Sequence, residues 1–122
     1  MANILIVDDS QTEALRFSQM LESNGFTTSV ASSGEDGVAA ATETKPDLVI
    51  MDVVMPGLNG FQATRQITRA NDTSHIPVII VTTKDQETDR VWAKRQGATA
   101  FLTKPVSEKV LVDAIREALG ES

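Results

Sequence analysis

The chain has 122 residues, a formal net charge of −6 and no cysteine. A chain of this length buries one core, so we expect a single domain over residues 1–122 with no output domain. The acidic balance disfavours nucleic acid as a partner, since that would need clustered Lys and Arg, and the lack of cysteine excludes disulfides and thiol chemistry. No apolar run approaches a membrane span and no signal peptide precedes the first strand, so we expect a cytoplasmic protein.

Apolar β-branched runs alternate with amphipathic segments along the whole chain. In chain order we expect a strand over residues 3–7, a helix between Ser10 and Asn24, a strand over 26–30, a helix between Ser33 and Pro46, a strand over 47–51, a helix between Asn59 and Asn71, a strand over 76–81, a helix over 86–96, a strand over 100–103 and a helix from Ser107 to Leu119. Strands that alternate with helices in this way imply right-handed βαβ crossovers in a parallel sheet.

Polar residues follow four of these strands and decide the expected strand order. Asp8 and Asp9 follow the first strand, and Asp52 follows the third. Thr82 follows the fourth strand and Lys104 follows the fifth. In open α/β sheets, ligands bind at the carboxyl ends of the strands, where the strand order reverses. The carboxylates can meet only if the first and third strands are neighbours. We therefore predict an α/β, flavodoxin-like doubly wound fold with a five-stranded parallel sheet of order 2-1-3-4-5 and five helices.

Asp8, Asp9 and Asp52 would form a cluster of three carboxylates. Like charges about 4 Å apart repel by roughly 1 kcal/mol in water and roughly 4 kcal/mol at an effective dielectric constant of about 20, so such a cluster favours a bound cation. Mg²⁺ suits this site, because proteins bind it through one or two carboxylates together with waters and phosphate oxygens. The alternative is that Asp8 or Asp9 only caps the first helix.

Lys104 and Thr82 are the other candidates at this edge. The Lys104 ammonium, placed over the carboxylates, would bind an incoming phosphoryl oxygen as a point charge. Otherwise it is a solvated surface lysine, the usual state of this residue type. Thr82 could donate a hydrogen bond to a new anionic group and move the following loop with it, or it could simply end its strand as a β-former.

The helix over residues 86–96 carries the one tryptophan of the chain. Val91 and Ala93 are its candidate core residues, and Trp92 lies between them. Trp92 cannot share their direction fully, so we expect it to be either half-buried or an exposed aromatic residue for a partner.

Four motifs at these strand ends resemble the receiver domain of two-component response regulators. They are Val7-Asp8-Asp9-Ser10, the run from Met51 to Gly60, Val81-Thr82-Thr83, and Thr103-Lys104-Pro105. The resemblance covers the whole chain. The segment from Thr83 to Asp89, with Trp92 and the run from Lys94 to Ala98, further resembles the single-domain receivers of type IV pilus chemosensory systems (twitching motility, PilH-like).

The resemblance implies that Asp52 accepts a phosphoryl group from a phosphohistidine on a histidine kinase or phosphotransfer domain. It also implies that Asp8, Asp9, Asp52 and the backbone carbonyl of Val54 hold Mg²⁺. A protein of this kind is a signalling domain that becomes phosphorylated itself, and it is not an enzyme acting on a separate substrate.

The resemblance further implies how the signal would leave the domain. Lys104 would pair with the phosphoryl oxygens and Thr82 would switch toward them, so that a downstream protein target binds the face formed by the fourth helix, fifth strand and fifth helix. The family often carries Tyr three residues before this lysine. Phe101 stands there in this chain, which keeps the ring but removes the hydrogen bond of a hydroxyl. Val54 and Lys84 offer neither amide nor carboxylate to orient a hydrolytic water, so we expect a long-lived phosphorylated form.

Three other functions compete with this prediction. A phosphohydrolase of the haloacid-dehalogenase type needs a second aspartate two residues after the nucleophile, where this chain has Val54. A flavodoxin-like cofactor carrier needs a phosphate-cradling loop after the first strand, where Asp8 and Asp9 would repel the FMN phosphate. A degenerate receiver that serves only as a scaffold is disfavoured, because no site residue is missing.

Overall fold

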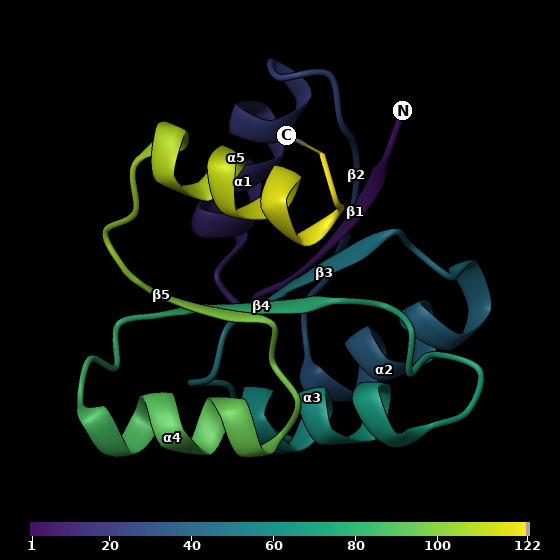
Figure 1. Cartoon of the computed structure of the whole chain (residues 1–122), viewed down its shortest axis with the longest axis vertical. Helices are drawn as coiled ribbons and strands as arrows, with labels where there is room; N and C mark the ends of the chain where they lie inside the picture. The colour runs from purple at the N-terminus through teal and green to yellow at the C-terminus, as the bar shows by residue number, and fades with distance from the viewer. Residues whose placement is uncertain (122) are drawn as a thin grey trace.

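A computed structural model describes residues 1–121 of the chain. Within those residues the chain forms five strands that alternate with five helices (Figure 1). The elements are β1 (Asn3–Val7), α1 (Gln11–Glu22), β2 (Thr27–Ala31), α2 (Gly34–Thr44), β3 (Leu48–Met51), α3 (Gly60–Arg69), β4 (Val78–Thr82), α4 (Glu87–Arg95), β5 (Ala100–Thr103) and α5 (Glu108–Ala118).

The five strands form one parallel sheet of order β2-β1-β3-β4-β5, which confirms the predicted fold. Val7 at the end of β1 lies opposite Met51 at the end of β3, so the residues that follow them leave the sheet side by side. Thr82 and Thr103 are paired in the same way on β4 and β5. The sheet register therefore brings the four motif-bearing strand ends to one edge.

Helices cover both faces of the sheet, with α1 and α5 on one face and α2, α3 and α4 on the other (Figure 1). Alternate residues of each strand point to opposite faces. On β1, Ile4 and Ile6 accordingly pack in the core beneath α1 and α5, whereas Leu5 and Val7 belong to the core on the other side. Both cores are apolar, as expected for parallel strands that are buried on both faces.

Most element boundaries agree with the sequence-based expectation to within two residues, and β4 shows the reason for one difference. We expected this strand to begin at Ile76, but it begins at Val78. Pro77 has no backbone N–H to donate to the ladder, although its carbonyl still accepts a hydrogen bond of 3.0 Å from the Val49 N–H. β4 therefore begins at Val78, directly after the proline.

The expectation for the core face of α4 was partly wrong. Ala93 is buried, but Val91 is 43% exposed. Trp92 is 51% exposed, which agrees with the expectation for this residue. Gln96 takes the second inward position and is buried. This helix has few apolar residues, so its sequence gives only a weak indication of which side faces the core. No helix within residues 1–121 combines the length and apolar character that crossing a lipid bilayer requires.

Candidate functional site

Asp52 follows the last residue of β3 and makes two hydrogen bonds with the backbone of its neighbours. Its N–H donates to the Val7 carbonyl at 2.9 Å, and its Oδ1 accepts a hydrogen bond of 2.8 Å from the Val53 N–H. The Gly60 N–H donates to the Val53 carbonyl at 3.0 Å. The start of α3 thus packs directly against the backbone that carries Asp52, whose side chain remains 11% exposed at the carboxyl edge of the sheet.

Asp8 and Asp9 occupy the turn between β1 and α1. Asp8 is buried, and its N–H donates to the Ala31 carbonyl at 3.1 Å. One oxygen, Oδ1, accepts a hydrogen bond of 2.9 Å from the Ser10 N–H, while Oδ2 faces the site. Asp8 therefore contributes a carboxylate to the cluster and orders the turn before α1. The helix cap that the sequence left open as its alternative role is supplied by Ser10, whose side chain accepts from the Glu13 N–H. Asp9 is exposed beside it.

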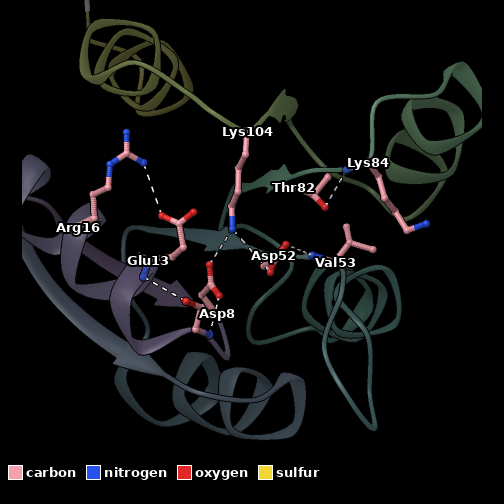
Figure 2. Close-up of polar contacts among 9 residues, drawn as sticks. Asp8, Glu13, Arg16, Asp52, Val53, Thr82, Lys84 and Lys104 are labelled. Carbon is pink, nitrogen blue, oxygen red and sulfur yellow. Dashed lines mark hydrogen bonds and ion pairs between the residues drawn. The ribbon is translucent and has the colours of Figure 1, made fainter.

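Lys104 reaches across the site from the end of β5 (Figure 2). Its Nζ lies 3.0 Å from Asp8 Oδ2 and 3.7 Å from Asp52 Oδ2, and its side chain is only 9% exposed. Its backbone N–H donates to the Thr82 carbonyl at 2.8 Å, which ties the end of β5 to the end of β4. The solvated lysine that the sequence left open as an alternative is thus not what the structure shows.

The three aspartates converge as the sequence predicted. One carboxylate oxygen from each of Asp8, Asp9 and Asp52 lies within 4.8 Å of the other two. Within residues 1–121, Lys104 is the one cation in ion-pair contact with this cluster. Three carboxylates and one ammonium leave a net negative charge, and an all-oxygen donor set with an exposed member suits a hard divalent cation such as Mg²⁺.

The surroundings of Asp52 raise its pKa above the ordinary value of 3.8. Burial is the largest cause, because it disfavours the charged form, and the neighbouring charges of Asp8 and Asp9 act in the same direction. The Lys104 ammonium and the Val53 N–H lower the pKa but do not outweigh burial. Asp52 therefore holds its negative charge at a free-energy cost that an additional cation would relieve.

Within residues 1–121, neither Thr82 nor Val54 makes a hydrogen bond with the three carboxylates. Thr82 is fully buried at the end of β4, and its Oγ1 accepts a hydrogen bond of 3.4 Å from the Lys84 N–H (Figure 2). The Val54 side chain is 56% exposed. Lys84 is directed away from the aspartates and pairs with Asp89 at 4.0 Å.

The sequence did not indicate a contact between α1 and the loop after β5, which lies beside the site. Arg16 Nη2 donates to the Val106 carbonyl at 3.4 Å, and Arg16 Nη1 pairs with Glu13 at 3.6 Å. This contact joins α1 to the loop that follows Lys104. The spacing of Ser10 and Glu13 is that of a capping box and could have drawn attention to Glu13. The contact between Arg16 and Val106 spans 90 residues, and no local pattern predicts it.

Residues 4–116 match the family described as "Response regulator receiver domain". The chain is similar to Protein PilH of Pseudomonas aeruginosa, with 62% identity over 120 residues that cover 98% of this chain and 99% of that protein. It is also similar to the response regulator PleD of Caulobacter vibrioides, with 35% identity over 115 residues, which span 94% of this chain but only 25% of that protein.

Solved structures of similar proteins also match over nearly the whole chain. The chemotaxis protein CheY4 of Vibrio cholerae superposes with a TM-score of 0.91 at 28% identity, covering 97% of this chain and 98% of that one. The receiver domain of the sensor histidine kinase PA1611 from Pseudomonas aeruginosa superposes with a TM-score of 0.90 at 27% identity, covering 98% of both chains. That structure is described as having a magnesium ion coordinated in the active-site cleft.

Proposed function

The chain belongs to the response regulator receiver domain family, and from this we propose that it accepts a phosphoryl group on Asp52 from a phosphohistidine of a histidine kinase or phosphotransfer domain. The observation that supports this most strongly is the placement of the Asp52 carboxylate, beside two more carboxylates and 3.7 Å from the Lys104 ammonium. The phosphoryl transition state carries charge on its equatorial oxygens, and a site of this kind works by positioning and charge stabilisation.

In the proposed transfer, an Asp52 carboxylate oxygen attacks the phosphorus of the phosphohistidine. The new O–P bond forms as the P–N bond to the donor imidazole breaks, and the leaving imidazole keeps the electron pair of that bond. Asp52 becomes an acyl phosphate, so this side chain is the covalent nucleophile. Because the Val53 N–H holds Oδ1 at 2.8 Å, Oδ2 is the oxygen directed toward Lys104 and the incoming group.

Lys104 provides the fixed positive charge of the site. Its ammonium is anchored on Asp8 at 3.0 Å, so it is already ordered before the phosphoryl group arrives. After transfer, the phosphoryl oxygens become the strongest acceptors in its reach. We propose that Lys104 then shifts its contact from Asp52 Oδ2 to a phosphoryl oxygen.

Asp8, Asp9, Asp52 and the backbone carbonyl of Val54 would hold Mg²⁺. When bound, the ion neutralises the carboxylates and binds phosphoryl oxygens, which lowers the repulsion that an incoming phosphate meets. The carboxylate cluster supports this proposal, as does the magnesium ion described for the PA1611 receiver domain. The exposed position of Asp9 gives the ion a route from solvent.

The signal would leave through the loops that follow β4 and β5. Thr82 Oγ1 accepts one weak hydrogen bond at present and can instead donate its proton to a phosphoryl oxygen. That movement would carry the loop before α4 with it and bias the face of α4, β5 and α5 toward a downstream protein target. Phe101 has no hydroxyl, so its ring would contribute by packing alone.

The 62% identity to PilH supports a role in a chemotaxis-like or pilus motility system. We propose that the protein either transmits a signal there by protein contact or drains phosphate from a sibling receiver. It would not act as an enzyme on a separate substrate. We place the exchange in the cytoplasm, because a histidine kinase takes its phosphoryl group from ATP.

The proposal is tested with a small phosphodonor, which removes the need for the kinase. The protein is incubated with acetyl phosphate and Mg²⁺, and intact mass spectrometry follows the addition of one phosphoryl group. We expect addition to the wild-type protein, and none with Asp52→Asn or in EDTA. Asp36→Asn, which changes an exposed aspartate on α2, is the matched control and should label normally. Steady phosphate release from unrelated monoesters would instead favour the hydrolase.

A further inference from the structure

We propose that the groove between α3 and α4 is a docking site for an acidic segment of a partner protein that carries an apolar side chain. The groove has a volume of about 250 Å³ and is lined by residues from both helices and the turn before α3: Asn59, Phe61, Gln62, Arg65, Trp92 and Gln96. The two helices lie side by side on the same face of the sheet (Figure 1), and the Thr68 hydroxyl joins them by donating to the Gln96 carbonyl at 2.6 Å. This inference goes beyond the proposed phosphotransfer.

The groove is a different surface from the face formed by α4, β5 and α5. The Arg90 guanidinium lies 5.1 Å from the centre of the Phe101 ring, so Arg90 marks the side of α4 that faces β5. Trp92 follows two residues later, which is a rotation of about 200° around a helix of 3.6 residues per turn. The Trp92 side chain accordingly turns away from β5 and lines the groove with α3.

The groove presents partly exposed apolar surface. Trp92 is 51% exposed, with the Arg95 guanidinium 5.7 Å from the centre of its ring, and Phe61 on α3 is only partly buried. Tryptophan is among the residues that carry most binding energy in interfaces, because it offers a large rigid surface and a polar N–H. An exposed tryptophan that faces a second aromatic residue across a groove is suited to hold one apolar side chain of a partner.

Gln96 supplies polar groups in the wall of the groove. The residue is 7% exposed, and its side-chain amide is not among the fully buried polar groups that lack a partner within residues 1–121. Because Gln96 lines the groove, a peptide backbone bound there could donate to its oxygen and accept from its nitrogen.

The charge around the groove selects an acidic partner. Arg65 and Arg69 project from α3, a helix without any acidic residue, and Arg95 projects from the last turn of α4. None of these three cations has an ion-pair partner among residues 1–121, although the chain as a whole has a formal charge of −6. Arginines without carboxylate partners are suited to bidentate contacts with carboxylates. The overall negative charge disfavours nucleic acid as the occupant.

The first test selects ligands without assuming a sequence. A displayed library of random peptides is panned on the unphosphorylated full chain, with depletion on Trp92→Ala protein. We expect the enriched peptides to be rich in Asp and Glu around one aromatic or aliphatic residue. Enrichment of basic peptides, or no enrichment over the depleted pool, would overturn the proposal.

The second test locates the bound peptide. The most enriched peptide, labelled with fluorescein, is titrated with protein while its anisotropy is recorded. We expect Arg65→Glu and Arg95→Glu each to weaken binding at least about tenfold, and Trp92→Ala to do the same. Lys109→Glu on α5 makes the same change in net charge at an exposed position away from the groove, and it should bind like the wild type.

Three results would contradict the proposal that the groove binds an acidic segment. Equal weakening by Lys109→Glu would show an effect of net charge alone. Tighter binding of fluorescein-labelled single-stranded DNA than of the acidic peptide would identify nucleic acid, and dimerisation lost in Trp92→Ala would identify a second copy. Acetyl phosphate labelling of the same variants is measured in parallel, so a failure of the groove proposal stays separate from a failure of phosphotransfer at Asp52.

Discussion

Asp52 holds its charge in a mostly buried position beside Asp8 and Asp9, and that arrangement has a consequence for stability. Its pKa in the folded protein is raised above 3.8 chiefly by burial, so the folded state binds this proton more tightly than the unfolded state does. Ionised Asp52 therefore opposes folding at neutral pH. As the pH falls through the raised pKa toward 3.8, Asp52 becomes protonated in the folded protein and the opposition disappears.

We accordingly predict that Asp52→Asn raises the free energy of unfolding at neutral pH in EDTA. The gain over the wild type should shrink as the pH is lowered through the carboxyl range. Urea denaturation curves at a series of pH values measure this difference. Asp36→Asn is the matched control and should be slightly destabilising, because Asp36 lies in the first turn of α2, where a negative charge is favourable. A destabilised Asp52→Asn protein at neutral pH would contradict the account.

The positive charge of Lys104 should affect the rate at which Asp52 is phosphorylated. Removing the one ammonium from the cluster with Lys104→Ala should slow acetyl phosphate labelling of Asp52 by about a hundredfold, the effect of losing one preorganised group that stabilises transition-state charge. Initial rates from intact mass spectra provide the measurement. Lys109→Ala, on the exposed side of α5, should leave the rate unchanged. An unaltered rate for Lys104→Ala would remove Lys104 from the mechanism.

The sequence predicted these residues because each one ends or follows a strand, and the register of a parallel sheet then brings strand ends together. Asp8, Asp52 and Lys104 converge for that reason. The contact from Arg16 to the Val106 carbonyl could not be predicted, since it joins α1 to a loop 90 residues further along the chain and depends on how α1 packs. Whether Asp8 caps α1 or joins the cluster was open for a similar reason, because only the packed structure shows that Ser10 is the cap and that Asp8 faces Lys104.

At the scale of the elements, the contact between α3 and the Asp52 loop positions the site. A Cβ built on Gly60 would collide with the backbone carbonyl of Asp52 and lie 2.7 Å from the Val53 Cα. The first turn of α3 can therefore approach this loop only with glycine at that position. The Gly60 N–H then reaches the Val53 carbonyl at 3.0 Å.

Gly60→Ala is predicted to destabilise the protein by about 1–3 kcal/mol, because the collision is with backbone that cannot move aside without displacing Asp52. It should also lower the extent of labelling. Urea denaturation and intact mass measure the two effects. Gly120→Ala tests the reasoning, since Gly120 has a positive φ of 79° but nothing within 4 Å of the added carbon. That variant should lose stability through backbone strain but keep full labelling.

The helices were easier to predict in position than in orientation. The sequence placed the starts of two helices at Ser10 and Ser107, and the side chains of both serines accept a backbone hydrogen bond from the first turn of α1 or α5. In α4, by contrast, the packing against α3 and β5 decides which face turns inward. That packing leaves Val91 exposed and buries Gln96, a choice the apolar pattern of a nine-residue helix could not specify.

At the scale of the whole molecule, the surroundings of Asp52 bear on how long a phosphorylated state lasts. Val54 is exposed and apolar, and Lys84 is paired with Asp89 at 4.0 Å, so neither supplies a group that would orient a water toward the phosphorus. We predict that the label, once the phosphodonor is removed, decays over minutes to hours. Intact mass spectra taken at intervals follow the decay. Loss within seconds without a phosphatase would contradict this prediction.

The central claim is that four strand ends create one pocket in which Asp52 alone captures phosphorus. Borohydride reduces an acyl phosphate on aspartate to homoserine, so treatment of the labelled protein followed by peptide mapping identifies the acceptor. The account predicts homoserine at position 52 only, formed with Mg²⁺ and absent in EDTA. Homoserine at Asp8 or Asp9, or an undiminished label in Asp52→Asn, would contradict it.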